Sequence, residues 1–378
     1  MSREYPYWMA FAHLPKIKNL KKNNILVKLY EEEKSLTDMF NADITELKEK
    51  YEMTPDEINI FEENKKELPN YSFLAEDLLN QGYEIIPITS KDYSPTMKGN
   101  LKRNYSPTLL YVKGNKQIMQ ENSIAIVGSR KCSDISLEFT DNIAKIASEQ
   151  FKVVVSGFAK GIDKQALDSA IKYNGQSIIV LPQGITTYAS GFKKYYRKII
   201  DGDVLVLSTF HPKAAWSVPL AMARNPIIYG LAKEIYVAES SDKGGTWSGV
   251  LDGLKKGREI YIRKPDENEK NANSILIGKG GTAIDINGNV IHADKIMEKK
   301  TESLEKTSDK NDDWSRIEEL LSKGAYTSNE IIDKLKIDFS PRKLTNELKK
   351  RDGIIIVRKK SPIKFSLINI EKQASLFN

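Results

Sequence analysis

The region of residues 123–263 alternates short apolar runs with helix-like segments, and this alternation limits the possible folds more than any other feature. The apolar runs predict strands at residues 124–127, 153–156, 177–181, 204–208, 234–238 and 259–262. Helix-like segments lie between them at residues 135–150, 163–173, 219–231 and 246–256. Near-continuous apolar strands joined by helices are typical of a parallel sheet covered on both faces. We therefore predict an α/β fold, a Rossmann-like doubly wound parallel sheet, with ligands bound beyond the carboxyl ends of its strands.

The sequence on either side of this region predicts further domains. Residues 1–82 read as a helical N-terminal module, with a helix start at Thr54-Pro55 and acids in the first turn. A packing role suits this module better than DNA binding, because no glycine-centred helical hairpin is visible. Residues 83–296 form the predicted Rossmann-like domain. Residues 297–312 are charged and nearly devoid of large apolar side chains, so we predict a linker.

Residues 313–370 predict a winged-helix-like domain. Thr327 opens a helix with a capping box, Ser340-Pro341 is predicted to cap a third helix, and residues 354–358 and 364–367 read as a two-stranded wing. The segment has 13 Lys and Arg against 8 Asp and Glu. Its candidate DNA contacts are Arg342, Lys343, Lys349, Lys350, Lys359 and Lys360. Such a module inserts a helix into duplex DNA or, alternatively, binds only protein.

Composition narrows the functional classes. The net charge of +7 suits an acidic partner such as nucleic acid, although a lysine-rich genome would also produce it. A single cysteine, Cys132, excludes an internal disulfide framework, and three scattered histidines leave no zinc-ligand spacing. No apolar run approaches the roughly 20 residues that span a bilayer, and no signal peptide is visible. We expect a soluble cytoplasmic protein that does not bind membranes.

The sheet-edge loops lack the common catalytic and cofactor motifs. The first loop reads Gly128-Ser129-Arg130 rather than GxGxxG, and neither a P-loop nor a GxSxG elbow occurs. No acidic cluster on the loops could hold a catalytic metal. We therefore predict no catalytic residues, no metal and no cofactor, and expect that the protein is not an enzyme.

These loops instead predict contacts to phosphate. Backbone amides at helix N-termini favour anions, and arginine and lysine at the same rim add charge. The predicted DNA- or phosphate-binding residues are Gly128, Ser129, Arg130, Ser156, Gly157, Lys160, Gly161, Arg224, Asn225, Gly244, Gly245 and Thr246. Repeated phosphate contacts along one edge suit single-stranded nucleic acid. The nearby aromatic residues Phe158, His211, Tyr229 and Trp247 are expected to pack rather than to stack on bases.

Several motifs together resemble the bacterial DNA-processing family DprA, also called Smf. They are residues 124–130 (IAIVGSR), 156–163 (SGFAKGID), 179–184 (IVLPQG) and 224–231 (RNPIIYGL), followed by the winged-helix tail. The resemblance implies single-stranded DNA binding on the Rossmann-like domain, a homodimer, and delivery of the strand to a RecA-type recombinase during natural transformation or a related uptake or defence process. Changes in the family pattern, such as residues 243–249 (KGGTWSG) in place of SGSLxTA, mark a divergent member.

Two alternatives remain open from the sequence. The Gly244-Gly245-Thr246 loop also resembles the lysine-decarboxylase-like nucleotide hydrolases, which implies a nucleotide sensor or an enzyme that cleaves an N-glycosidic bond. Their glutamate is missing here, since Asp252 is the first carboxylate after the loop. A third possibility is an adaptor whose winged helix recruits protein only.

Overall fold

The computed structural model describes residues 4–291, 309–337, 339–349, 351, 354–358 and 363–367. The chain divides into two compact units, Met1–Ile291 and His292–Asn378. The predicted boundary near residue 82 falls within the first unit and stays a prediction. Most of the predicted linker lies outside the described residues.

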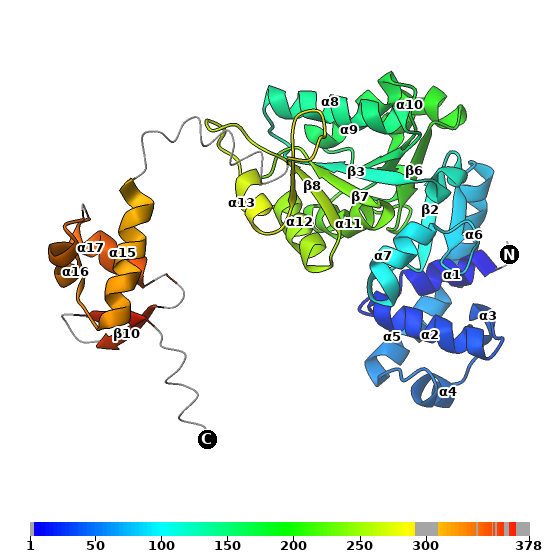
Figure 1. Ribbon diagram of the computed structural model, residues 1–378. Coiled ribbons are helices and arrows are strands. Elements are labelled where there is room, and N and C mark those ends of the chain that lie inside the picture. Colours follow the sequence, from blue (N-terminus) through cyan, green and yellow to red (C-terminus); the bar gives the residue numbers. More distant parts are fainter. Residues whose placement is uncertain are drawn as a thin grey trace. The chain divides into compact units, whose positions relative to one another are not determined.

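A nine-stranded sheet forms the centre of the first unit (Figure 1). The strands are β1 (Glu84–Pro87), β2 (Leu109–Lys113), β3 (Ser123–Val127), β4 (Val153–Ser156), β5 (Ser177–Val180), β6 (Val204–Ser208), β7 (Glu234–Val237), β8 (Glu259–Arg263) and β9 (Thr282–Ile284). Their spatial order is β1-β2-β6-β5-β4-β3-β7-β8-β9.

The sheet is mostly parallel. The pairs from β6 across to β9 are all parallel, whereas β1 pairs with β2, and β2 with β6, in the antiparallel sense. The predicted α/β class is confirmed in this mixed form: the six strands predicted in residues 123–263 are β3 to β8 and are parallel, and the antiparallel pairs arise at β1 and β2, before that region. β1 and β2 precede the β–α–β repeat, whose crossover helices are what connect parallel neighbours.

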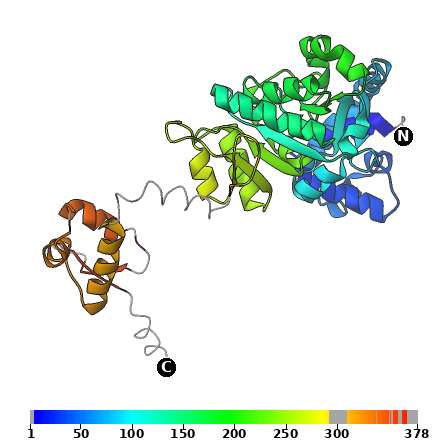
Figure 2. The same ribbon diagram turned by 45° about the horizontal axis from the view of Figure 1, so that its top comes forward.

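Helices cover both faces of the sheet (Figures 1 and 2). On one face lie α8 (Asp134–Glu149) and α9 (Ile162–Lys172), whose Phe139 and Ile162 share a core with Ile126. On the other lie α11 (Val218–Leu231) and α12 (Gly245–Lys255), whose Ile228 and Val250 share a core with Val127. Ile126 and Val127 enter opposite cores because successive strand side chains point to opposite faces.

The order in which strands are added to the sheet changes side at β3. Strands β3 to β6 proceed to one side, and α11 then returns the chain to β7 on the other side of β3. The loops that follow β3 and β7 therefore separate at this switch point, and a crevice forms where they part. Two further helices complete this region, α10 (Ala189–Ile200) after β5 and α13 (Asn273–Gly278) after β8.

Helices at the start of the chain pack against the antiparallel edge. They are α1 (Tyr5–Ala12), α2 (Asn19–Glu31), α3 (Leu36–Phe40), α4 (Ile44–Glu49), α5 (Pro55–Lys66) and α6 (Leu68–Asn80), with α7 (Pro95–Tyr105) between β1 and β2. The capping box predicted at Thr54 is present. Trp8 of α1 and Val206 of β6 belong to one continuous core, so the helices and the sheet share their interior.

The second unit contains three helices and a hairpin among its described residues. They are α15 (Asp309–Lys323), α16 (Ser328–Leu335), α17 (Pro341–Leu348), β10 (Ile354–Arg358) and β11 (Lys364–Leu367). β10 and β11 are antiparallel, and Tyr326 bridges to Phe365. The capping box at Thr327 is present. The third helix begins where it was predicted, with Ser340 at the N-cap and Pro341 as its first residue, although the Ser340 side chain makes no capping hydrogen bond. α15 begins inside the predicted linker.

Candidate functional site

Two adjoining cavities lie along the carboxyl edge of the sheet. The first, of about 500 Å³, includes the loop after β3 and residues 244–246, and the second, of about 420 Å³, includes the loops after β4 and β5. Both are lined by Arg130, Ala159, Ala221 and Arg224, so they form one surface, which we call the sheet-edge groove. All the predicted loop residues except Ser156 and Gly161 line it.

Two exposed cations stand on the rim of this groove. Arg130 follows β3 and Lys160 precedes α9, and neither forms an ion pair or side-chain hydrogen bond within the described part of the chain. Lys131 and Lys243, which were not among the predicted contacts, also line the first cavity and are exposed. A ligand that supplies negative charge would meet these cations without displacing a protein carboxylate.

The third predicted cation, Arg224, is buried in the floor where the cavities meet. Its side chain is 4% exposed, its Nη1 donates to the carbonyl of Val180 at 3.3 Å, and Asp163 lies 3.9 Å away. Its Nε has no hydrogen-bond partner among the described residues. Burial lowers the pKa of Arg224 and raises the pKa of Asp163, although each group's charge favours ionisation of the other. Arg224 is thus an incompletely paired cation below the groove surface.

Two of the predicted glycines, Gly157 and Gly161, are required by the packing of the loops themselves. A Cβ on Gly157 would lie 1.3 Å from Arg224 Nη1, so this glycine makes room for the buried guanidinium. Gly161 has φ 80°, and a Cβ there would meet the carbonyl oxygens of Ser129 and Arg130 at 2.5 and 2.7 Å.

Some predicted polar contacts are already used within the protein. The amide of Ser129 donates to the carbonyl of Glu239 at 2.9 Å. Buried Ser156 donates through Oγ to the carbonyl of Ile126. The cationic side chains, rather than a ring of free amides, are therefore the main anion contacts that the structure offers.

The loop before α12 forms the far wall of the first cavity. Gly244, Gly245 and Thr246 line it, with Asn225 of α11 packed close to Gly245. Asp252, the first carboxylate after this loop, lies outside the groove and pairs with Lys256 at 2.6 Å. Of the groove-lining residues, only Asp163 carries a carboxylate, and it is buried beside Arg224.

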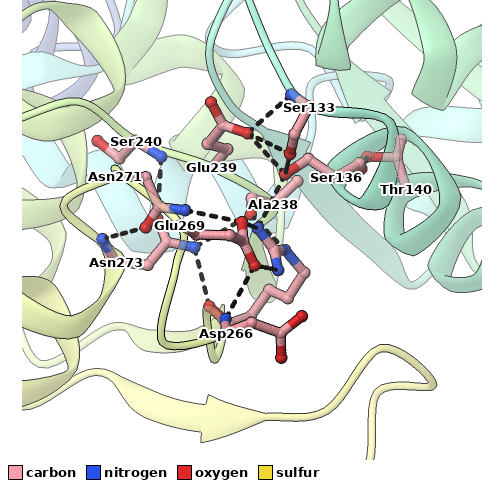
Figure 3. A network of polar contacts seen from close by, with 11 residues as sticks. Ser133, Ser136, Thr140, Ala238, Glu239, Ser240, Asp266, Glu269, Asn271 and Asn273 are labelled. Carbon is pink, nitrogen blue, oxygen red and sulfur yellow. Dashed lines mark hydrogen bonds and ion pairs between the residues drawn. The ribbon is translucent and has the colours of Figure 1, made fainter.

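A network of buried polar contacts closes the neighbouring part of the same edge (Figure 3). Glu239, after β7, accepts hydrogen bonds at the N-terminus of α8 from the amide and hydroxyl of Ser133 and the hydroxyl of Ser136. Arg263, 1% exposed, donates to both carboxylate oxygens of Glu269, to the carbonyl of Ala238 and to Ser136. The protein's own carboxylates therefore occupy the anion positions here.

Sequence reasoning missed two aromatic residues of the groove, Tyr188 and Trp216. Trp216, in the loop before α11, is 51% exposed and lines the second cavity. Phe158 packs edge-on against Tyr188 and Tyr195, and His211 packs against His13, as expected for packing residues. Trp216 lies far in sequence from the glycine loops, so motif spacing could not associate it with them.

Within the described ranges, no group of three or more His, Cys, Asp or Glu side chains is placed to hold a metal ion. The described helices include none that combines the length and apolar character needed to cross a membrane.

The fold and groove together define an α/β protein that presents cations at the switch point of a mostly parallel sheet. Residues 84–298 match the family of DNA recombination-mediator protein A, and the chain belongs to this DprA/Smf family of DNA-processing proteins. It is 33% identical over 159 residues to DNA processing protein DprA of Streptococcus pneumoniae, across 41% of this chain and 55% of that protein. It is 28% identical over 183 residues to protein Smf of Escherichia coli, across 47% of each.

The fold is also similar to a solved relative. The X-ray structure of DNA processing protein A from Streptococcus pneumoniae superposes with a TM-score of 0.61 at 23% identity, covering 74% of this chain and 94% of that one. The sequence matches span about half the length of the curated relatives.

Proposed function

We propose that this protein binds single-stranded DNA along the sheet-edge groove and acts in DNA processing and recombination. The observation that carries the proposal is the pair of unpaired, exposed cations, Arg130 and Lys160, at two successive loops of one groove. Family membership supports a nucleic-acid ligand. We expect binding without catalytic turnover. A nucleotide hydrolase would need a carboxylate just after the Gly244-Gly245-Thr246 loop, and this chain has none there.

The length of this edge of the sheet suits a short stretch of single-stranded DNA. The loops after β5, β4, β3 and β7 follow four neighbouring strands. At about 4.8 Å between strands they extend roughly 14 Å, which corresponds to about four nucleotides at a rise of about 3.4 Å. Trp216 at one end offers an exposed ring on which a base would stack.

The resemblance extends the proposal to partners. Delivery of the strand to a RecA-type recombinase, a homodimer, and a role in transformation or defence all remain proposals. The recombinase role predicts faster filament formation on DNA coated with single-strand-binding protein when this chain is added. A lack of acceleration despite tight strand binding would contradict that role.

We also propose that the second unit is a winged-helix domain that contacts duplex DNA or a protein partner. Its order of three helices and a hairpin supports this, and Arg342, Lys343 and Lys349 are exposed on or next to α17. The remaining candidates Lys350, Lys359 and Lys360 lie outside the described residues. Removal of residues 313–378 should leave single-strand affinity largely intact, and a total loss would assign that binding to this unit instead.

Charge reversal at the rim is the direct test of the groove. Arg130→Glu and Lys160→Glu should each weaken binding of a labelled oligothymidylate about tenfold or more, because each variant replaces a phosphate contact with repulsion. The matched control is Lys164→Glu, an exposed lysine of α9 that lines neither cavity. Unchanged binding in both rim variants would rule out the sheet-edge groove as the DNA-binding site.

If a mononucleotide competes as strongly as the oligonucleotide, a nucleotide sensor is favoured. If the protein binds neither ligand, the adaptor is favoured.

A further inference from the structure

The helices α2 and α7 lie side by side (Figure 1), and residues of both line a second groove, separate from the sheet-edge groove. We propose that it binds a short acidic peptide of a partner protein, in which carboxylates adjoin an apolar side chain. Its volume is about 420 Å³, and it shares no lining residue with the sheet-edge groove. A space of this size accommodates one or two side chains with their backbone rather than a folded surface.

The floor of this groove is apolar. Leu26 and Val27 of α2 and Ile88 after β1 line it, and Leu26 is 8% exposed. Tyr30, one turn along α2 from Val27, stands at the groove with 81% of its surface exposed. A leucine- or phenylalanine-sized side chain laid between them would remove apolar surface from water.

The wall formed by α7 is cationic. Lys98, Lys102 and Arg103 line the groove, and all three are exposed. Within the described ranges, no carboxylate oxygen lies within 4.0 Å of their charged nitrogens. The ammonium of Lys98 lies over the ring of Tyr93, 5.6 Å from its centre. Carboxylates of a ligand would thus find cations that the chain itself does not neutralise.

Two buried polar atoms at the groove, one on α2 and one at the end of α7, are acceptors that a ligand with hydrogen-bond donors can satisfy. The side-chain nitrogen Nδ2 of Asn23 donates to the backbone carbonyls of Arg103 and Ser106, at 2.7 and 2.9 Å, and so fixes the end of α7. Asn23 Oδ1 and Ser106 Oγ have no partner among the described residues, although these side chains are 4% and 1% exposed. Both residues line the groove.

The combination selects a peptide over other anions. A backbone N–H can donate to Asn23 Oδ1 while side-chain carboxylates meet the α7 cations. A fatty acid would satisfy the floor and one cation but has no N–H to donate. A nucleic-acid strand supplies charge, but its largest aliphatic group is the methyl of thymine, which is smaller than the side chain that the floor accommodates. The proposal does not depend on the function proposed for the sheet-edge groove.

A labelled peptide tests the proposal with the full-length protein. The probe is a fluorescein-labelled hexapeptide of four aspartates followed by Leu-Phe, and its fluorescence anisotropy should rise to saturation. Lys102→Glu combined with Arg103→Glu should weaken binding about tenfold or more, because two attractions become repulsions. The matched control, Lys48→Glu combined with Lys164→Glu, makes the same net charge change at two exposed lysines that do not line the groove, and it should bind normally. Saturable binding that is equal in all variants would overturn the proposal.

Two further measurements keep the result interpretable if the double variant folds poorly. Ser106→Ala should weaken the peptide about threefold, as loss of one hydrogen bond would, while the unfolding temperature stays unchanged because Ser106 Oγ has no protein partner. Decanoate and oligothymidylate should fail to displace the peptide. Displacement by decanoate would identify the groove as a fatty-acid site, and displacement by oligothymidylate would identify it as a nucleic-acid site. Either result would overturn the proposal of a peptide ligand.

Discussion

Two buried arginines at the same edge of the sheet have opposite surroundings. Arg263, at the end of β8, is paired with both oxygens of Glu269 and also donates to Ala238 and Ser136. Arg224, under the sheet-edge groove, makes one hydrogen bond of 3.3 Å and has its nearest carboxylate 3.9 Å away.

This difference shows where the fold leaves room for a ligand. Around β7 and β8, Glu239 and Glu269 supply the anions that a helix N-terminus and a guanidinium attract. Around β3 and β4, the cations face a cavity instead. The same edge is therefore internally neutralised around Glu239 and Arg263, and open to an outside anion around Arg130, Lys160 and Lys243.

The largest effect is expected from breaking the complete pair. Arg263→Met should lower the free energy of unfolding by about 3–5 kcal/mol, because it leaves the largely buried Glu269 without its cation. Urea denaturation measures the change. Arg263→Met combined with Glu269→Met should recover part of the loss, and strand affinity per folded molecule should stay unchanged in both. A single variant as stable as the parent protein would show that the pair is not holding this edge together.

Arg224→Met should cost less stability, about 1–3 kcal/mol, because its hydrogen bonding is already incomplete. It should also weaken strand binding. The raised pKa of Asp163 rises further without Arg224, so the folded state binds a proton more readily than the unfolded chain. Stability differences between variant and parent should therefore narrow as the pH falls from 7 towards 5. If the difference in unfolding free energy between the variant and the parent protein grew as the pH fell, Asp163 would not be the group left unpaired.

Glu239→Gln should have a smaller effect on stability, about 1 kcal/mol. The amide keeps one acceptor for Ser133 and Ser136 but loses the charge at the N-terminus of α8. Thermal unfolding measures the change, and Glu138→Gln, an exposed residue of the same helix, is the control. If both variants lost the same stability, the cap would have no special role.

The smallest effect on stability is expected at the rim, where the informative quantity is salt dependence. Arg130→Ala should change the unfolding free energy by less than about 0.5 kcal/mol, because the side chain is exposed and unpaired. The slope of log affinity against log salt should become shallower by about 0.7, the contribution of one phosphate contact on a single strand. An identical slope would mean that Arg130 does not contact phosphate.

Sequence predicted the repeating part of the fold well. Val153–Ser156 and Val204–Ser208 were predicted to the residue, since short apolar runs between helices leave few alternatives. Helix α10 was missed, because its apolar contact is limited to a few positions, such as Tyr195 and Ile199, among basic residues. The antiparallel edge was missed because the pairing of β2 with β6 joins residues about a hundred positions apart.

At the candidate site, the sequence predicted which loops line the groove, but not which of their side chains are buried or already paired. Arg130 and Lys160 are exposed as expected of cations in loops, whereas Arg224 is buried. Only the three-dimensional packing reveals this, because Gly157 of another segment provides the space that the guanidinium occupies. The occupation of the α8 N-terminus by Glu239 likewise depends on a loop more than a hundred residues away.

The core shared by the first helix and the sixth strand has a consequence for synthesis. Trp8 and Val206 belong to the same interior, so this interior is complete only after more than about 200 residues have left the ribosome. The elements that contact α1 directly, α3, α6 and β2, are made long before that. The first helix can therefore find its own partners early, while the part of this core that β6 closes stays uncovered until β6 is made.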